Sequence, residues 1–136
     1  YFRDPVMTAD RFVDGWFNTG DYVRMEEGCV RILDRVTDII IVGGFNVYPQ
    51  EVEAILHTHP AVSQAVVVGM PHPVNGEVPK AFIQLREGMQ VTSREIIDFC
   101  KKHLAHFKVP RSIEFMESFP LSSTGKVLRR MLKQPK

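Results

Sequence analysis

The chain has 136 residues, of which 44% are hydrophobic and 24% are charged, as is typical of a globular domain with a modest core. No apolar run approaches the roughly 18 residues of a membrane span, and the polar start of the chain does not resemble a signal peptide. The two cysteines, Cys29 and Cys100, indicate neither a disulfide framework nor a metal site. These features favour the cytoplasm, with peripheral membrane contact left open. Because the chain begins at Tyr1, we expect a fragment of a longer protein.

Charge is unevenly distributed, although the formal net charge is only +1. Residues 101–136 contain nine Lys or Arg and two acidic residues, whereas residues 1–60 contain five Arg and ten acidic residues. The basic C-terminal third favours an anionic partner, and a basic face in contact only with solvent is the plain alternative. No aromatic-rich RNA-binding signature accompanies it, so we predict no nucleic-acid partner.

The first part of the chain predicts irregular structure followed by two hairpins. Residues 1–21 have little periodicity and many turn formers, so we expect irregular structure that depends on sequence outside this chain. Short apolar runs around Glu-Glu-Gly and Gly-Gly turns then predict four paired strands, at 22–25, 29–33, 39–42 and 45–47. The polar segment 34–38 separates the two hairpins and is the best candidate for a linker or domain boundary.

The second part predicts a small sheet with helices. Pro49 suits the first turn of a helix, Thr92 and Glu95 form a capping box that begins another, and a short helix is expected at 127–133. Residues 70–79 hold three prolines and predict a turn-rich loop. Strands are predicted at 63–69, 80–85 and 112–116. The first of these is almost wholly apolar, which favours a central place in the sheet. The fold class is therefore α+β, a small two-layer domain with a hairpin and a small mixed sheet packed with two to three helices.

The segment SFPLSSTGKVLRR (118–130) places Gly125 and Lys126 at the end of a turn of small residues. It is not a P-loop, because no glycine lies five residues before Gly125 and Val127 replaces the Ser or Thr that would hold magnesium. A glycine beside a lysine nevertheless permits an unusual turn with wide reach. An ammonium group can neutralise charge on a phosphoryl or carboxylate oxygen during group transfer. A catalytic lysine on a mobile turn and a plain solvated turn are both open at this point.

Two further polar segments suit nucleotide binding. In NTGD (18–21), Asp21 follows a Thr-Gly turn and could accept hydrogen bonds from a ribose diol, or it could close a local turn. Arg35 lies between Asp34 and Asp38. Its guanidinium could bind hydroxyl or phosphate oxygens, or it could form an exposed ion pair of little energetic value.

The histidines and hydroxyl residues indicate no further chemistry. His57 and His59 lie near a helix end without a cysteine or carboxylate cluster to complete a metal site, so we predict no metal ligands. The sequence has neither a nucleophile elbow nor a convincing Ser-His-Asp grouping.

Four ordered motifs together resemble one protein family. They are GWFNTGD (15–21), DRVTDIIIVGGFNVYPQEVE (34–53), HFKVP (106–110) and PLSSTGKVLRR (120–130). In this order they resemble the C-terminal motifs of the AMP-forming acyl-CoA synthetases, a superfamily that also contains luciferases and the adenylation domains of peptide synthetases. The resemblance covers essentially the whole chain, and the segment GFNVYPQEVE looks most like bacterial long-chain fatty acid ligases.

The resemblance implies a division of the chain and a two-step reaction. Residues 1–34 would be the end of a large N-terminal adenylation domain, and residues 35–136 would be a mobile C-terminal domain. The partner of this chain would be the missing N-terminal domain. The acyl pocket would lie in that domain, so this chain does not reveal the acyl chain length. ATP and a carboxylate such as a fatty acid, with Mg²⁺, would give an acyl-adenylate and pyrophosphate. Coenzyme A would then give acyl-CoA and AMP, and the isolated fragment would be inactive.

The resemblance also assigns roles to residues in the first step. Lys126 matches the lysine that bridges the acyl carboxylate and the α-phosphate. Asp21 matches the aspartate that holds the AMP ribose hydroxyls, and Thr19 and Arg35 belong to the same ATP- and AMP-binding set.

For the second step, Gly44 matches a glycine in the hairpin that swings in for thioester formation. A side chain there would block the pantetheine arm, and Gly43 and Phe45 flank the same tunnel. The hinge falls at Thr37, where the family usually has Asp or Lys. A hinge needs tolerance of a large backbone change more than a particular side chain.

Two other functions remain open from the sequence. One is an adenylating enzyme that loads an acyl or aminoacyl group onto a carrier protein instead of coenzyme A. The other is a non-catalytic nucleotide- or anion-binding module, which the basic C-terminal third would suit.

Overall fold

The computed structural model describes residues 3–133 and divides into two compact units. The N-terminal unit extends to Thr37 and the C-terminal unit begins at Asp38. This boundary lies three residues after the predicted division between residues 34 and 35. It falls inside a short 3-10 helix, η1 (Val36–Asp38), within the polar segment that sequence analysis proposed as a linker.

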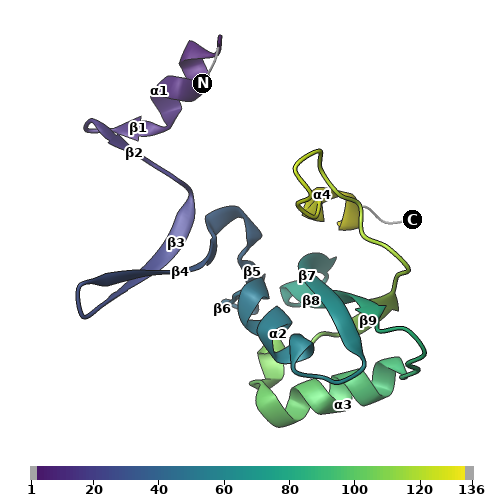
Figure 1. Ribbon diagram of the computed structural model, residues 1–136. Helices are drawn as coiled ribbons and strands as arrows, with labels where there is room; N and C mark the ends of the chain where they lie inside the picture. Colours follow the sequence, from purple (N-terminus) through teal and green to yellow (C-terminus); the bar gives the residue numbers. More distant parts are fainter. Residues whose placement is uncertain (1–2, 134–136) are drawn as a thin grey trace. The chain divides into compact units, whose positions relative to one another are not determined.

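The N-terminal unit has more regular structure than its sequence predicts (Figure 1). It contains one short helix and two antiparallel hairpins: α1 (Pro5–Asp10), β1 (Phe12–Val13), β2 (Trp16–Phe17), β3 (Asp21–Glu26) and β4 (Cys29–Arg35). The predicted irregular structure over residues 1–21 is therefore wrong for α1, β1 and β2. The signals were local: the Asp4 carboxylate caps α1 by accepting from the Met7 N–H at 2.8 Å, and Asp14-Gly15 closes the first hairpin with positive φ at both residues.

The second hairpin of this unit is confirmed and is longer than predicted. Its strand β4 continues to Arg35, through the first residues of the segment that was expected to be a polar break. Asp34 lies opposite Tyr22 in the ladder and is only 1% exposed. Its carboxylate accepts from the backbone N–H of Arg35 at 2.8 Å, so the buried side chain has a hydrogen-bond partner within strand β4.

The C-terminal unit is a mixed five-stranded sheet with helices, as predicted (Figure 1). Its strands run in the order β6-β5-β8-β7, and β9 pairs in parallel with β8 beside β5. Their bounds are β5 (Ile40–Val42), β6 (Phe45–Val47), β7 (Val62–His72), β8 (Gly76–Leu85) and β9 (Ser112–Phe115). The helices are α2 (Pro49–His57), α3 (Ser93–His103) and α4 (Arg129–Leu132), with a 3-10 turn η2 (His106–Lys108) after α3.

Two predictions about β7 and β8 are wrong. The expected loop at 70–79 is mostly strand, because the two strands continue to a tight turn and pair as far as His72 opposite Gly76. Pro71 and Pro79 fit within this ladder, since proline's fixed φ suits an extended strand where its missing N–H is not needed. In addition, β7 is an edge strand and β8 is the central one.

The apolar run in β7 instead reflects a sheet that is covered on both faces. On one face, α2 and α3 pack Val52, Leu56, Ile96 and Cys100 against inward residues of the strands, including Val67. On the other face, a second cluster joins strand residues to the C-terminal segment: Val66, Val68, Phe82, Phe119 and Leu132. Alternate residues of β7 therefore enter different cores, which explains why both positions of the alternation are apolar.

The two main helices begin where the sequence predicts. Pro49 is the first residue of α2. At α3, the Thr92 hydroxyl accepts from the Glu95 N–H and the Glu95 carboxylate accepts from the Thr92 N–H. The hydrogen bond from the Thr92 backbone is the main reason that the pKa of Glu95 is lowered. The predicted capping box is thus confirmed.

The buried thiol on α3 gives a test of this packing. Burial raises the pKa of Cys100 to about 11, so the thiol stays protonated and unreactive near pH 7.5. We expect maleimide to modify the exposed Cys29 of the 136-residue chain and to modify Cys100 only after urea unfolds it. Peptide mass spectrometry distinguishes the two sites. Equal labelling of both cysteines without urea would contradict the described core.

Candidate functional site

Lys126 lies at the end of a small closed hairpin formed by residues 121–127. Leu121 and Val127 pair as an antiparallel bridge. The Ser122 N–H donates to the Lys126 carbonyl at 2.8 Å, and the Gly125 N–H donates to the Ser122 carbonyl at 2.9 Å. Gly125 has φ +78°, a backbone conformation that residues with a side chain rarely adopt. The glycine before Lys126 is therefore required by the turn itself.

The side chain of Lys126 is exposed at this hairpin. Its backbone N–H donates to the Ser122 hydroxyl at 3.1 Å, which fixes the main chain from which the side chain projects. Within residues 3–133, its ammonium group forms no ion pair. The hairpin thus presents a positive charge to solvent or to a ligand from a defined backbone position.

Arg129, three residues after Lys126, anchors this hairpin to helix α2 and strand β7 of the C-terminal unit. Its guanidinium forms a bidentate pair with Glu53 of α2, with Nη1–Oε1 at 2.7 Å and Nη2–Oε2 at 3.0 Å. Nη1 also donates to the Val67 carbonyl at 2.7 Å, and the Val67 N–H donates to Glu53 Oε1 at 2.7 Å. The Arg129–Glu53 pair therefore satisfies both backbone groups of Val67 on the edge strand β7.

This anchor is not apparent from the sequence. Neither Glu53 nor Arg129 receives a role from the sequence. In the structure, Glu51 pairs with Lys108 at 2.6 Å and Glu53 pairs with Arg129. The two pairs join residues that are 57 and 76 positions apart, so no local pattern in the sequence could identify the partners.

A second group of predicted site residues lies together in the N-terminal unit. Arg35 Nε is 2.8 Å from Asp21 Oδ1, and Arg35 Nη1 donates to the Thr19 carbonyl at 3.1 Å. The local turn bond comes from the Asp21 backbone N–H, which donates to the Thr19 hydroxyl at 3.2 Å, whereas the Asp21 carboxylate pairs with Arg35. The unit therefore brings Thr19, Asp21 and Arg35 into one cluster of hydroxyl, carboxylate and guanidinium groups.

This cluster has the groups needed to bind a polyhydroxylated ligand. The Asp21 side chain is 20% exposed and that of Arg35 is 58% exposed, so a ligand can reach both. A carboxylate offers about four acceptor positions on its two oxygens, and the pair with Arg35 leaves some of them available to hydroxyl donors. The turn bond and a ligand-binding role are therefore compatible.

Gly43 and Gly44 form the tight turn between β5 and β6, as predicted. Their φ values are +56° and +88°, which two-residue hairpin turns of this kind require. A Cβ on Gly44 would meet no atom within 4 Å, so the turn projects from the unit. The Gly43 N–H donates to the Asn75 carbonyl at 2.9 Å, which ties the turn to the β7–β8 hairpin.

A cavity of about 320 Å³ adjoins this glycine turn. Phe45 is 59% exposed, and its ring stacks on Phe107 of η2 with centroids 4.7 Å apart. Phe107 belongs to the HFKVP motif but received no role from the sequence. Its ring joins η2, and with it the HFKVP motif, to the glycine hairpin.

Thr37, the predicted hinge residue, is exposed in η1 and is the last residue of the N-terminal unit. Within residues 3–133, no group of three His, Cys, Asp or Glu residues is arranged to hold a metal ion. None of the helices in that range is long and apolar enough to cross a bilayer.

A protein-family model matches more than half of this chain. The model of the AMP-binding enzyme C-terminal domain matches residues 51–126, from the first turn of α2 to Lys126. The match includes Glu53 and residues 121–126 of the hairpin, and it ends three residues before Arg129.

Similar proteins extend the likeness over nearly the whole chain. Long-chain-fatty-acid–CoA ligases of Haemophilus influenzae and Bacillus subtilis are 42% and 44% identical to it, over 98% and 97% of this chain. The chain spans about a quarter of the length of these relatives, 24% in both.

One solved structure shows the same fold at a similar level of identity. It is the o-succinylbenzoate CoA synthetase of Bacillus subtilis in complex with its acyl-adenylate intermediate. That protein has a TM-score of 0.91 and 37% identity to this chain, covering 100% of this chain and 28% of the other. Together with the family model, this likeness shows that the chain belongs to the AMP-binding enzyme C-terminal domain family.

Proposed function

We propose that this chain is the C-terminal part of an ATP-dependent, AMP-forming acyl-CoA ligase whose preferred substrates are fatty acids. Residues 1–34 would then end a large adenylation domain, and residues 35–136 would form the domain that moves between the two steps. The similarity to long-chain-fatty-acid–CoA ligases supports the substrate class. ATP and coenzyme A as substrates would place the reaction in the cytoplasm.

The observation on which the proposal depends most is the exposed lysine on an anchored hairpin. In the first step, a carboxylate oxygen attacks the α-phosphorus of ATP, the bond from that phosphorus to the α,β-bridging oxygen breaks, and pyrophosphate departs. Negative charge accumulates on the oxygens around the α-phosphorus. The Lys126 ammonium would neutralise that charge and hold the carboxylate against the phosphate. Mg²⁺, when bound to ATP, would supply further charge neutralisation, and no described residue of this chain is assigned to it.

The Thr19–Asp21–Arg35 cluster would bind the nucleotide in the same step. The Asp21 carboxylate would accept hydrogen bonds from the ribose hydroxyls, while Arg35 holds the carboxylate at 2.8 Å and limits its rotation. The contact of Arg35 with the Thr19 carbonyl at 3.1 Å would keep the NTGD turn in place. A fixed carboxylate binds a diol at a smaller entropic cost than a free one.

The glycine turn would act in the second step. The thiol of coenzyme A attacks the acyl carbon of the adenylate, and AMP leaves as the thioester forms. Gly43 and Gly44 would let the pantetheine arm pass close to the backbone, and Phe45 would form an apolar wall. The movement between steps would take place about Thr37, at the boundary of the two units. An acceptor on a carrier protein would use the same pantetheine chemistry.

Replacement of Lys126 tests its proposed role. In the full-length enzyme, Lys126→Ala should slow adenylate formation by about 100- to 1,000-fold, the usual cost of losing one charge-stabilising donor. Thioester formation from supplied acyl-adenylate should stay within about twofold. Carboxylate-dependent exchange of pyrophosphate into ATP measures the first step. Lys102→Ala removes another exposed lysine and is the matched control. Equal loss of both half-reactions would refute the assignment.

Replacement of Gly44 tests the second step. Gly44→Leu should slow thioester formation by about tenfold or more, because the added side chain fills the path of the acceptor arm. Adenylate formation should be unchanged. Gly88→Leu introduces a side chain at a similar φ of +73° with nothing within 4 Å, so it controls for backbone strain alone. An identical effect of both leucines would show that strain, and not obstruction, explains the result.

A further inference from the structure

We infer that Arg129 is a positioning residue for Lys126, so that the ion pair between Arg129 and Glu53 sets the rate of adenylate formation without touching the substrate. This inference rests on the proposed function of Lys126. It concerns the contacts of the hairpin base, which the family likeness does not assign.

The hairpin has few other attachments near Lys126. Its own hydrogen bonds, Ser122 to Lys126 and Gly125 to Ser122, close the turn on itself and do not bind it to the rest of the unit. Leu121 at its base is 56% exposed. Val127 contacts the apolar cluster that includes Phe119 and Leu132, but such contacts are non-directional. Before the hairpin, Gln84 of β8 donates to the Glu117 carbonyl at 2.6 Å; after it, the directional contacts to β7 and to α2 come from Arg129.

The contacts of Arg129 are short, and they converge. The guanidinium side chain is 24% exposed and that of Glu53 is 13% exposed, so the pair is largely withdrawn from water and is weakly screened. Two parallel hydrogen bonds to a carboxylate define the orientation of a guanidinium group as well as its position. The third hydrogen bond, to the Val67 carbonyl, fixes the guanidinium group relative to strand β7.

A further contact extends the anchor to the start of the C-terminal unit. Arg129 Nε lies 3.7 Å from Asp38 Oδ2, and Asp38 is the first residue of that unit. One guanidinium group therefore joins three elements: the segment after Lys126, helix α2 with strand β7, and the residue next to the proposed hinge. A displacement of about 1 Å at Lys126 would be enough to lower a rate by about 100-fold.

The experiment compares Arg129→Gln with Arg130→Gln in the full-length enzyme. Arg130 is the neighbouring arginine and is exposed, so its replacement makes the same change of charge without breaking the anchor. We expect Arg129→Gln to slow adenylate formation by about 10- to 100-fold and to leave thioester formation from supplied adenylate within about twofold. Arg130→Gln should change neither rate. Proportional loss of both half-reactions, or identical effects of the two variants, would overturn the inference.

A double variant separates positioning from a structural role. If Arg129 acts through Lys126, Lys126→Ala with Arg129→Gln should form adenylate no more slowly than Lys126→Ala alone. Multiplied losses would overturn the inference. If Arg129→Gln does not fold, Glu53→Gln replaces it, because an amide can still accept from the Val67 N–H while it loses the ion pair. The same selective loss in the first half-reaction is expected, and unchanged adenylation in Glu53→Gln would count against the inference.

The same set of variants distinguishes this inference from the proposed function. Normal adenylation in Lys126→Ala would refute the proposed function and the inference together. Severe loss in Lys126→Ala with normal rates in Arg129→Gln would refute the inference alone.

Discussion

The open edge of strand β7 is the constraint on which the C-terminal unit depends. Val67 presents a backbone N–H and a carbonyl at that edge, and no further strand is present within residues 3–133 to pair with them. Glu53 and Arg129 take the place of a strand: the carboxylate accepts from the N–H and the guanidinium donates to the carbonyl, each at 2.7 Å. Because one partner comes from α2 and the other from the C-terminal segment, satisfying this edge also fixes the base of the Lys126 hairpin.

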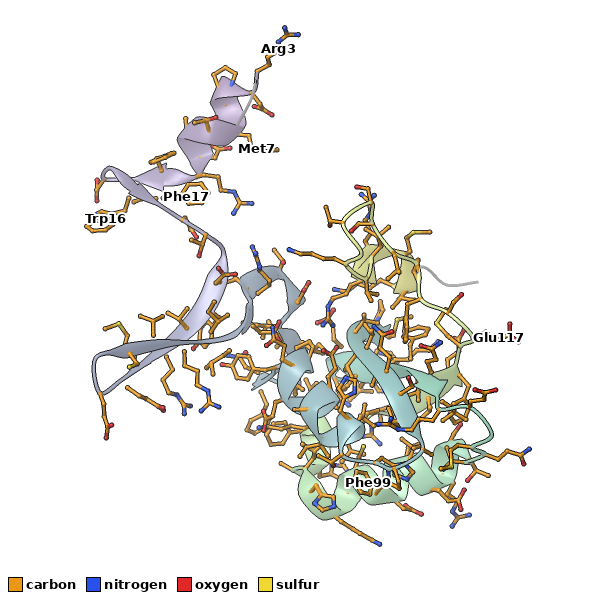
Figure 2. The ribbon with its side chains drawn as sticks, viewed as in Figure 1. Arg3, Met7, Trp16, Phe17, Phe99 and Glu117 are labelled. Carbon is orange, nitrogen blue, oxygen red and sulfur yellow. The ribbon has the colours of Figure 1, made fainter. Side chains whose placement is uncertain are left out.

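The two faces of this sheet pack against different parts of the chain. One face holds the main core under α2 and α3, and the other receives the segment that bears Lys126 (Figure 1). The glycine turn between β5 and β6 lies on yet another part of the unit, supported by Asn75 and Phe107. The N-terminal unit keeps apolar side chains such as Trp16, which is 82% exposed, at the β1–β2 hairpin (Figure 2). Exposed aromatic surface of this kind is typical of contacts with further protein.

Local signals in the sequence were sufficient for much of the fold. The Thr92 capping box, the Gly43-Gly44 turn and the α+β order depend on residues a few positions apart, and all three were predicted. The edge position of β7 was not, because a strand covered on both faces is apolar wherever it lies in a sheet. Likewise, Lys126 could be singled out from its turn, but Arg129 could not, since its partner Glu53 lies 76 positions away. The cluster of Thr19, Asp21 and Arg35 needed the register of the β3–β4 hairpin, which places Asp21 opposite Arg35.

The most direct test of the account is whether the full-length protein activates carboxylates by adenylation. The measurement is AMP and thioester formation with ATP, Mg²⁺ and coenzyme A, over a series of carboxylates from acetate to oleate, with a carrier protein as the alternative acceptor. We expect AMP and acyl-CoA to form in equal amounts and long-chain carboxylates to react fastest. If adenylate forms but its acyl group is transferred only to the carrier protein, the acceptor is the carrier protein and not coenzyme A. No adenylate with any carboxylate would contradict the account and would leave a nucleotide- or anion-binding module in its place.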